Sequence, residues 1–138
     1  MQRSTLRRPL PDEVIRQMAV NYGTASSGEP LPADEGTELL ADPSGNMVTT
    51  AQEMSYFMRA HLQQGRFGDY QLLKPETIAL MHAPAYVPVP GSPGTALGLF
   101  GADYNGRRIL VHDGDGSGDH SDMQLLLDEG VGFFSHFN

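Results

Sequence analysis

The residues best suited to chemistry gather between positions 112 and 122, which read HDGDGSGDHSD. This stretch holds two histidines, four aspartates and three glycines, and apolar residues flank it on both sides. Aspartate, serine and glycine are common turn formers, so a solvated loop is the simplest interpretation. Imidazoles and carboxylates also bind metal ions and transfer protons, and the same stretch therefore supports two functional interpretations.

The first functional interpretation is a calcium-binding loop that runs from Asp113 to Gln124. Oxygen donors and a glycine fall at the first, third, fifth, sixth, seventh and ninth positions of such a loop, namely Asp113, Asp115, Ser117, Gly118, Asp119 and Ser121. Two features argue against calcium. The twelfth position is Gln124 rather than a bidentate glutamate, and the flanking segments are typical of strands rather than helices.

The second functional interpretation depends on the order of three short motifs along the chain. Gly-Asn-Met-Val-Thr-Thr-Ala (45–51) leads into an amphipathic segment, Lys-Pro-Glu-Thr (74–77) begins another, and His-Asp-Gly (112–114) is followed by Gly-Val-Gly (130–132). From about Met18 to Asn138, this order resembles the C-terminal part of the β-lactamase-related, penicillin-recognising serine hydrolases. That family includes class C β-lactamases, penicillin-binding proteins, D-aminopeptidases and esterases.

The resemblance implies hydrolysis of an amide, ester or β-lactam through an acyl-serine. In that family, the serine of Ser-x-x-Lys attacks a carbonyl, the tyrosine of Tyr-x-Asn assists proton transfer, and Lys-Thr-Gly or His-x-Gly borders the cleft. His112-Asp113-Gly114 matches the third motif, which implies that His112 is a catalytic residue facing the cleft. Gly114 would let the substrate approach the backbone, and the Asp115 N–H would donate to the oxyanion. The partner is a small acyl substrate in the complete protein, and no cofactor is implied.

The other two motifs of the family are missing from this sequence. Its only lysine is Lys74, and Gln71 stands three residues before it. None of the five tyrosines is followed two residues later by asparagine. We therefore expect both motifs to lie upstream of residue 1, so that this chain alone supplies one wall of the site and catalyses no turnover.

Asp119 also departs from the family, whose members carry an aromatic or apolar residue there. The alternatives to this hydrolase fragment are the calcium-binding module and a non-catalytic interaction domain.

A helix and two hairpins are predicted to position these residues. Thr50 and Glu53 form a capping-box pattern, and apolar residues then recur at helical spacing, so we expect a helix over about 51–64. Pro75 is predicted to begin a short second helix that continues to Met81. Strands over 97–104 and 107–112 flank Asn105-Gly106, and strands over 123–127 and 131–137 flank the turn 128–130.

These elements predict an α+β fold, with an antiparallel sheet of three to four strands and one main amphipathic helix. The resemblance makes this a partial β-lactamase/transpeptidase-like fold. Residues 1–138 form a single partial domain, in which 1–11 are a loose N-terminal arm and 12–138 are the C-terminal portion of a serine hydrolase domain. Strand alternation puts Leu110 on the side of His112, and we expect Ile109 and Val111 to form the buried face. His61, His82 and His136 are interpreted as structural or surface histidines.

Composition excludes several other classes of protein. The formal net charge is -8, from 17 acidic and nine basic residues, which disfavours binding to nucleic acid. The chain has neither an apolar run long enough to span a membrane nor a signal peptide, and its compartment stays open. With no cysteine, it can form no disulfide and has no thiol nucleophile. We expect self-association through a sheet edge that the missing segments would otherwise cover.

Overall fold

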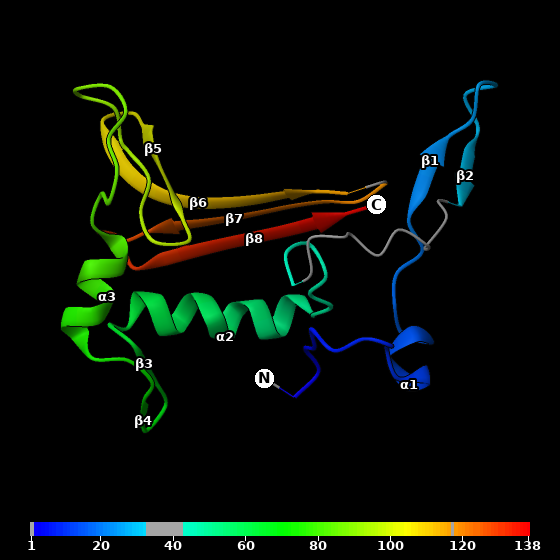
Figure 1. Ribbon diagram of the computed structural model, residues 1–138, viewed down its shortest axis with the longest axis horizontal. Helices are drawn as coiled ribbons and strands as arrows, with labels where there is room; N and C mark the ends of the chain where they lie inside the picture. The colour runs from blue at the N-terminus through cyan, green and yellow to red at the C-terminus, as the bar shows by residue number, and fades with distance from the viewer. Residues whose placement is uncertain (1, 33–42, 117) are drawn as a thin grey trace.

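The computed structural model describes residues 2–32, 43–116 and 118–138 (Figure 1). In chain order the elements are α1 (Asp12–Ile15), β1 (Tyr22–Thr24), β2 (Pro30–Pro32), α2 (Ala51–Leu62), β3 (Arg66–Phe67), β4 (Tyr70–Gln71), α3 (Pro75–His82), β5 (Phe100–Tyr104), β6 (Arg107–Asp115), β7 (His120–Leu126) and β8 (Val131–Phe137). The main sheet is antiparallel with the order β5-β6-β7-β8, and α2 lies along one of its faces (Figure 1). The predicted α+β class is confirmed. None of the helices in the described ranges has the length and apolar character that a membrane span needs.

The predicted hairpins form at the expected turns. Asn105 and Gly106 connect β5 to β6 with φ values of 53° and 77°, the left-handed region that this two-residue turn requires. Gly130, with φ of 67°, ends the turn between β7 and β8. A further hairpin is formed by β1 and β2, in which Gly23 pairs with Leu31.

The polar stretch after His112 is mostly strand rather than loop. Strands β6 and β7 continue through it, and Asp113 pairs with Asp122 while Asp115 pairs with His120. A calcium loop must curl so that alternate residues point at one ion, whereas here these residues lie in an extended ladder. The calcium interpretation is therefore wrong for the part of the loop that is described. Among the described residues, which do not include Ser117, no group of three acidic or histidine side chains is placed to hold a metal ion.

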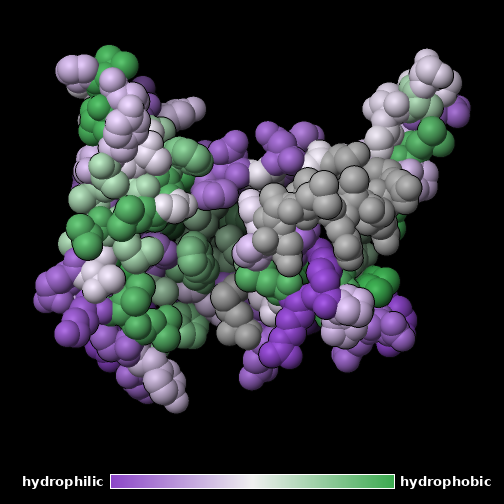
Figure 2. Space-filling view, in the orientation of Figure 1, coloured by the Kyte–Doolittle hydropathy of each residue, from purple (hydrophilic) through white to green (hydrophobic). Residues whose placement is uncertain are grey.

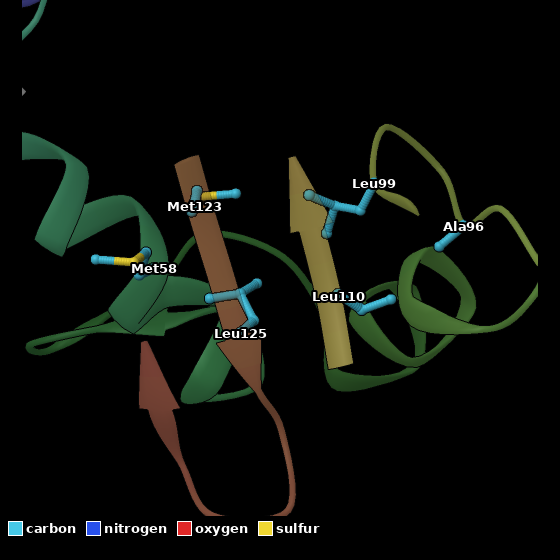
Figure 3. Close-up of a cluster of buried hydrophobic side chains, with 6 residues drawn as sticks. All are labelled: Met58, Ala96, Leu99, Leu110, Met123 and Leu125. Carbon is cyan, nitrogen blue, oxygen red and sulfur yellow. The ribbon is translucent and has the colours of Figure 1, made fainter. Parts of the chain in front are cut away.

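The core lies between α2 and the sheet. Leu110 of β6 pairs with Leu125 of β7, and both are fully buried at 0% exposure. Figure 3 shows how side chains from α2, from these two strands and from the segment before β5 complete the cluster: Met58, Met123, Leu99 and Ala96. Burying one leucine side chain contributes roughly 1.5–3 kcal/mol, so the two central leucines are a major source of stability.

The prediction that Ile109 and Val111 form the buried face of β6 is only partly right, because each face of the strand carries a buried residue. Leu110, which shares a face with His112, lies in the core cluster, whereas Ile109 is buried outside that cluster and Val111 is only half-buried. The prediction failed because β6 carries apolar residues on both faces. Alternation separates the two faces of a strand, but it does not say which of them the helix covers.

The first turn of α2 holds the N-terminal residues in place. The Thr50 hydroxyl accepts a hydrogen bond from the Glu53 N–H at 3.2 Å, as the capping box predicts. The Glu53 carboxylate, however, accepts hydrogen bonds from the Ser4 hydroxyl and from the backbone N–H groups of Gln2 and Arg3. Burial raises the pKa of Glu53, but these hydrogen bonds outweigh that effect and leave the pKa below its ordinary value. Residues 2–5 are therefore tethered, in contrast to the loose arm that was expected.

One edge and one face of the main sheet are uncovered by the described residues. Strand β8 pairs only with β7 among the described strands. On the face opposite α2, Val131, Phe133 and Phe137 of β8 are 51%, 52% and 56% exposed. Figure 2 shows hydrophobic residues gathered over the left and centre of the molecule, around α2, α3 and the sheet. An edge of this kind can pair with a further strand.

Candidate functional site

His112 lies on β6 beside the main core and is exposed at a cavity of about 580 Å³. The N-terminal residues, α2 and the sheet surround this cavity. The lining side chains are Ser4, Thr5, Leu6, Met47, Met54, Phe57, Leu99, His112, Ser121, Met123 and Phe134, with Gly98 completing the wall. Apart from His112, these side chains are apolar or carry a hydroxyl, and no aspartate, glutamate, lysine or arginine is among the described residues that line the cavity. In an acidic chain, the cavity is therefore an uncharged site with one imidazole on its wall.

Among the described residues, no strand pairs with one side of β6 next to His112. Strand β5 begins at Phe100, which pairs with Val111, so β6 extends beyond its neighbour from residue 112 onward. At the far end, the Gly116 N–H donates to the Asp119 carbonyl at 2.9 Å. Antiparallel pairs alternate between bonded and non-bonded, so the N–H and C=O of Asp115 point away from β7. The Asp115 N–H therefore lies on this edge of β6, three residues from His112.

Gly114 lies on the same face as His112 and pairs with Ser121 on β7. A Cβ atom at position 114 would approach the Ser121 Oγ at 2.8 Å and would meet no backbone atom. The Ser121 hydroxyl donates to the Gly114 carbonyl at 3.4 Å and also lines the cavity. The glycine thus leaves room for this hydroxyl. Ser121 was missed as a site residue because its position opposite Gly114 depends on the strand register.

The acidic residues of the stretch lie away from the cavity. Asp113, Asp115 and Asp122 point to the opposite face of the sheet, because they alternate with His112, Gly114 and Ser121. There, a carboxylate oxygen of Asp115 lies 2.6 Å from His120 Nδ1. Asp119 accepts a hydrogen bond from the Asn21 amide at 3.1 Å, which connects the tip of the β6–β7 hairpin to the segment before β1.

The three remaining histidines occupy different environments. His136 of β8 is exposed and pairs with Ser121 in the sheet register. His61 of α2 and His82 of α3 instead contact each other, with His61 Nδ1 and His82 Nε2 2.9 Å apart. They line a second cavity of about 480 Å³ at the α2–α3 junction. The sequence offered no signal for this pairing, because the two residues are 21 positions apart and lie on different helices.

The arrangement around His112 can bind and polarise a carbonyl group, but it contains no activated nucleophile. Ser121 hydrogen-bonds only to a carbonyl, and Ser4 bonds to Thr49 and Glu53. In the described ranges, no serine hydroxyl hydrogen-bonds to a histidine or lysine. A serine nucleophile needs an activating base of this kind within hydrogen-bond reach.

An antiparallel sheet with a helix along one face and a His-x-Gly strand bordering a cavity agrees with the fold of penicillin-binding proteins. The structure of an octameric penicillin-binding protein homologue from Pyrococcus abyssi is similar to the whole of this chain, with a TM-score of 0.78 at 17% sequence identity. The similarity covers 30% of that homologue, so this chain corresponds to a minor part of it. At this identity the likeness establishes the fold. No protein-family model matches the sequence, and no curated protein matches it.

Proposed function

We propose that this chain forms the His-x-Gly wall of a serine hydrolase site that acts on a small acyl substrate. The observation that carries the proposal is the position of His112, beside an uncharged cavity and three residues from the open Asp115 N–H. The fold shared with part of a penicillin-binding protein homologue supports it. The nucleophilic serine and its base, which this sequence lacks, would come from a segment outside the 138 residues.

In the proposed reaction, the serine hydroxyl attacks the carbonyl carbon of an amide, ester or β-lactam. The carbonyl oxygen then gains negative charge, and a fixed N–H donor stabilises that charge most strongly where water is excluded. The Asp115 N–H would be one such donor. The imidazole of His112 would donate a hydrogen bond to the substrate. Gly114 has no side chain, so the substrate could lie against the backbone of β6. These roles need no cofactor.

The proposal predicts that the isolated chain is catalytically inert. We expect no saturable hydrolysis of p-nitrophenyl esters or of a chromogenic β-lactam, because no serine hydroxyl in the described part of the chain hydrogen-bonds to a histidine or lysine. A longer polypeptide that adds the coding sequence upstream of residue 1 is expected to gain turnover and to be labelled covalently on a serine. Turnover by the 138-residue chain with labelling of one of its own serines would contradict the proposal. A longer polypeptide that contains no Ser-x-x-Lys would leave the non-catalytic interaction domain as the better interpretation.

We also propose that the isolated chain self-associates through β8 and the apolar residues on its exposed face. Strand β8 contains no aspartate, glutamate, lysine or arginine that would oppose pairing with a second copy. Sedimentation velocity is expected to show species larger than a monomer, and Phe133→Lys is expected to shift the chain toward monomer. Leu80→Lys on α3 is the control, since Leu80 is 65% exposed and lies outside the sheet. A monodisperse wild-type monomer would refute this.

A further inference from the structure

The histidine pair between α2 and α3 has the geometry of a direct hydrogen bond between two imidazoles. His61 Nδ1 and His82 Nε2 are 2.9 Å apart. The ring centroids are 5.2 Å apart and the ring planes differ by 20°, so the rings lie close to one plane with the bonded nitrogens between them. Such a bond needs one nitrogen that carries a proton and one that does not. The pair can therefore be neutral or carry one additional proton.

The surroundings of the pair disfavour positive charge. His61 is 7% exposed, and the Phe57 ring packs against it with centroids 4.6 Å apart. Burial lowers the pKa of both histidines; His82 lowers that of His61 further, and Arg108 of β6 lowers that of His82. The Arg108 atoms Nε and Nη2 are buried and have no hydrogen-bond partner among the described residues, so its charge is not neutralised there. Glu76 of α3 lines the same cavity but is not hydrogen-bonded to either ring.

We propose that the His61–His82 hydrogen bond is a pH-sensitive latch that holds the C-terminal end of α3 on α2. When both rings are protonated, both facing nitrogens carry hydrogen and both rings carry positive charge. The hydrogen bond then becomes impossible and the rings repel each other. The end of α3 has few other attachments: the Leu97 N–H donates to the Met81 carbonyl at 3.1 Å, and Ile78 is buried. Acidification should therefore release α3 together with the segment that follows it.

The direction of the pH dependence follows from the lowered pKa values. In the folded chain, the histidines bind protons less readily than they do in the unfolded chain. The latch therefore contributes its full stability above the ordinary histidine pKa of about 6.5. That contribution is lost as the pH falls through the lower pKa values that His61 and His82 have in the folded chain. Protonation of Glu53 also weakens the fold in acid, but Glu53 lies at the opposite end of α2. A local measurement separates the two effects. The latch does not depend on the proposed hydrolase function.

Hydrogen exchange of the α3 amides, corrected for intrinsic rates, tests the latch in the 138-residue chain. Between about pH 7.5 and pH 5, we expect wild-type protection in residues 75–82 to fall by about tenfold, the change that corresponds to one unit of pKa. In His82→Gln, whose amide can still hydrogen-bond to His61 but does not titrate, protection in α3 should depend on pH clearly less than in the wild type, with burial of His61 as the remaining cause. His136→Gln, at an exposed histidine of β8, should behave like the wild type.

Two results would overturn the latch. One is α3 protection in the wild type that does not change with pH. The other is an NMR titration of the wild type in which His61 and His82 titrate at or above the ordinary histidine value. Neither measurement depends on a variant that folds. If His82→Gln proves too unstable for exchange measurements, His61→Gln is the second variant, and it should reduce the pH dependence in the same way.

Discussion

Leu110→Ala is expected to remove a large fraction of the protein's stability. Leu110 is fully buried, pairs with Leu125 and belongs to the core cluster that includes Met58 of α2. Removing a buried leucine side chain costs about 2–5 kcal/mol, through lost burial and the cavity left behind. Small domains are stable by only about 5–15 kcal/mol, and part of this sheet is uncovered. Urea unfolding followed by circular dichroism should show a midpoint far below that of the wild type.

Leu80→Ala is the matched control for this experiment. Leu80 has the same side chain but is 65% exposed on α3, so its removal should change the free energy of unfolding by no more than about 0.5 kcal/mol. If Leu110→Ala and Leu80→Ala had similar small effects, the packing between α2 and the sheet would not be the main source of stability.

His112→Ala is expected to reduce turnover strongly in a longer polypeptide that carries this chain together with the nucleophile. A positioned proton donor or acceptor contributes about 10²–10⁴-fold to rate, so kcat/KM should fall within that range. Stability should change little, because the His112 side chain is exposed at the cavity and no hydrogen bond to it is found in the described part of the chain. Steady-state kinetics and the melting temperature should be measured on the same preparation.

His136→Ala serves as the control for His112→Ala. His136 is an exposed histidine on β8, two strands from β6, and the proposed reaction assigns it no role. We expect its loss to leave kcat/KM within a few-fold of the wild type. If His112→Ala instead lowered the melting temperature sharply while the folded fraction kept its specific activity, His112 would be a structural residue and the catalytic assignment would be wrong.

The parts of the fold that local rules determine could be predicted from the sequence. The Thr50 cap begins α2 at Ala51, and Asn105-Gly106 forms the β5–β6 turn, because both signals act through neighbouring residues. The ends of β6 and β7 could not be predicted in this way. Aspartate and glycine disfavour strands as isolated residues, yet the pairing of Asp113 with Asp122 continues a ladder that the apolar residues before it have already aligned.

The candidate site was only partly predictable for the same reason. His112 was singled out by a motif, which is a local pattern. The role of Ser121, the open edge at Asp115 and the contact between His61 and His82 depend on register, on strand length and on how two helices approach each other. The prediction of which face of β6 packs on α2 failed for a similar reason. Leu110 and Ile109 lie on opposite faces of the strand and both are buried, so the sequence does not distinguish the two faces.

The alternation along β6 has a consequence for how such a protein can vary by insertion or deletion. Leu110 and His112 lie on one face, two residues apart, so one strand register serves both the core and the cavity. A one-residue slip of β6 would turn both side chains to the other face together. The site therefore cannot lose its orientation by a change in register without also losing its central leucine from the core. An insertion or deletion near β6 that leaves Leu110 in the core would therefore also preserve the direction of the side chain at position 112.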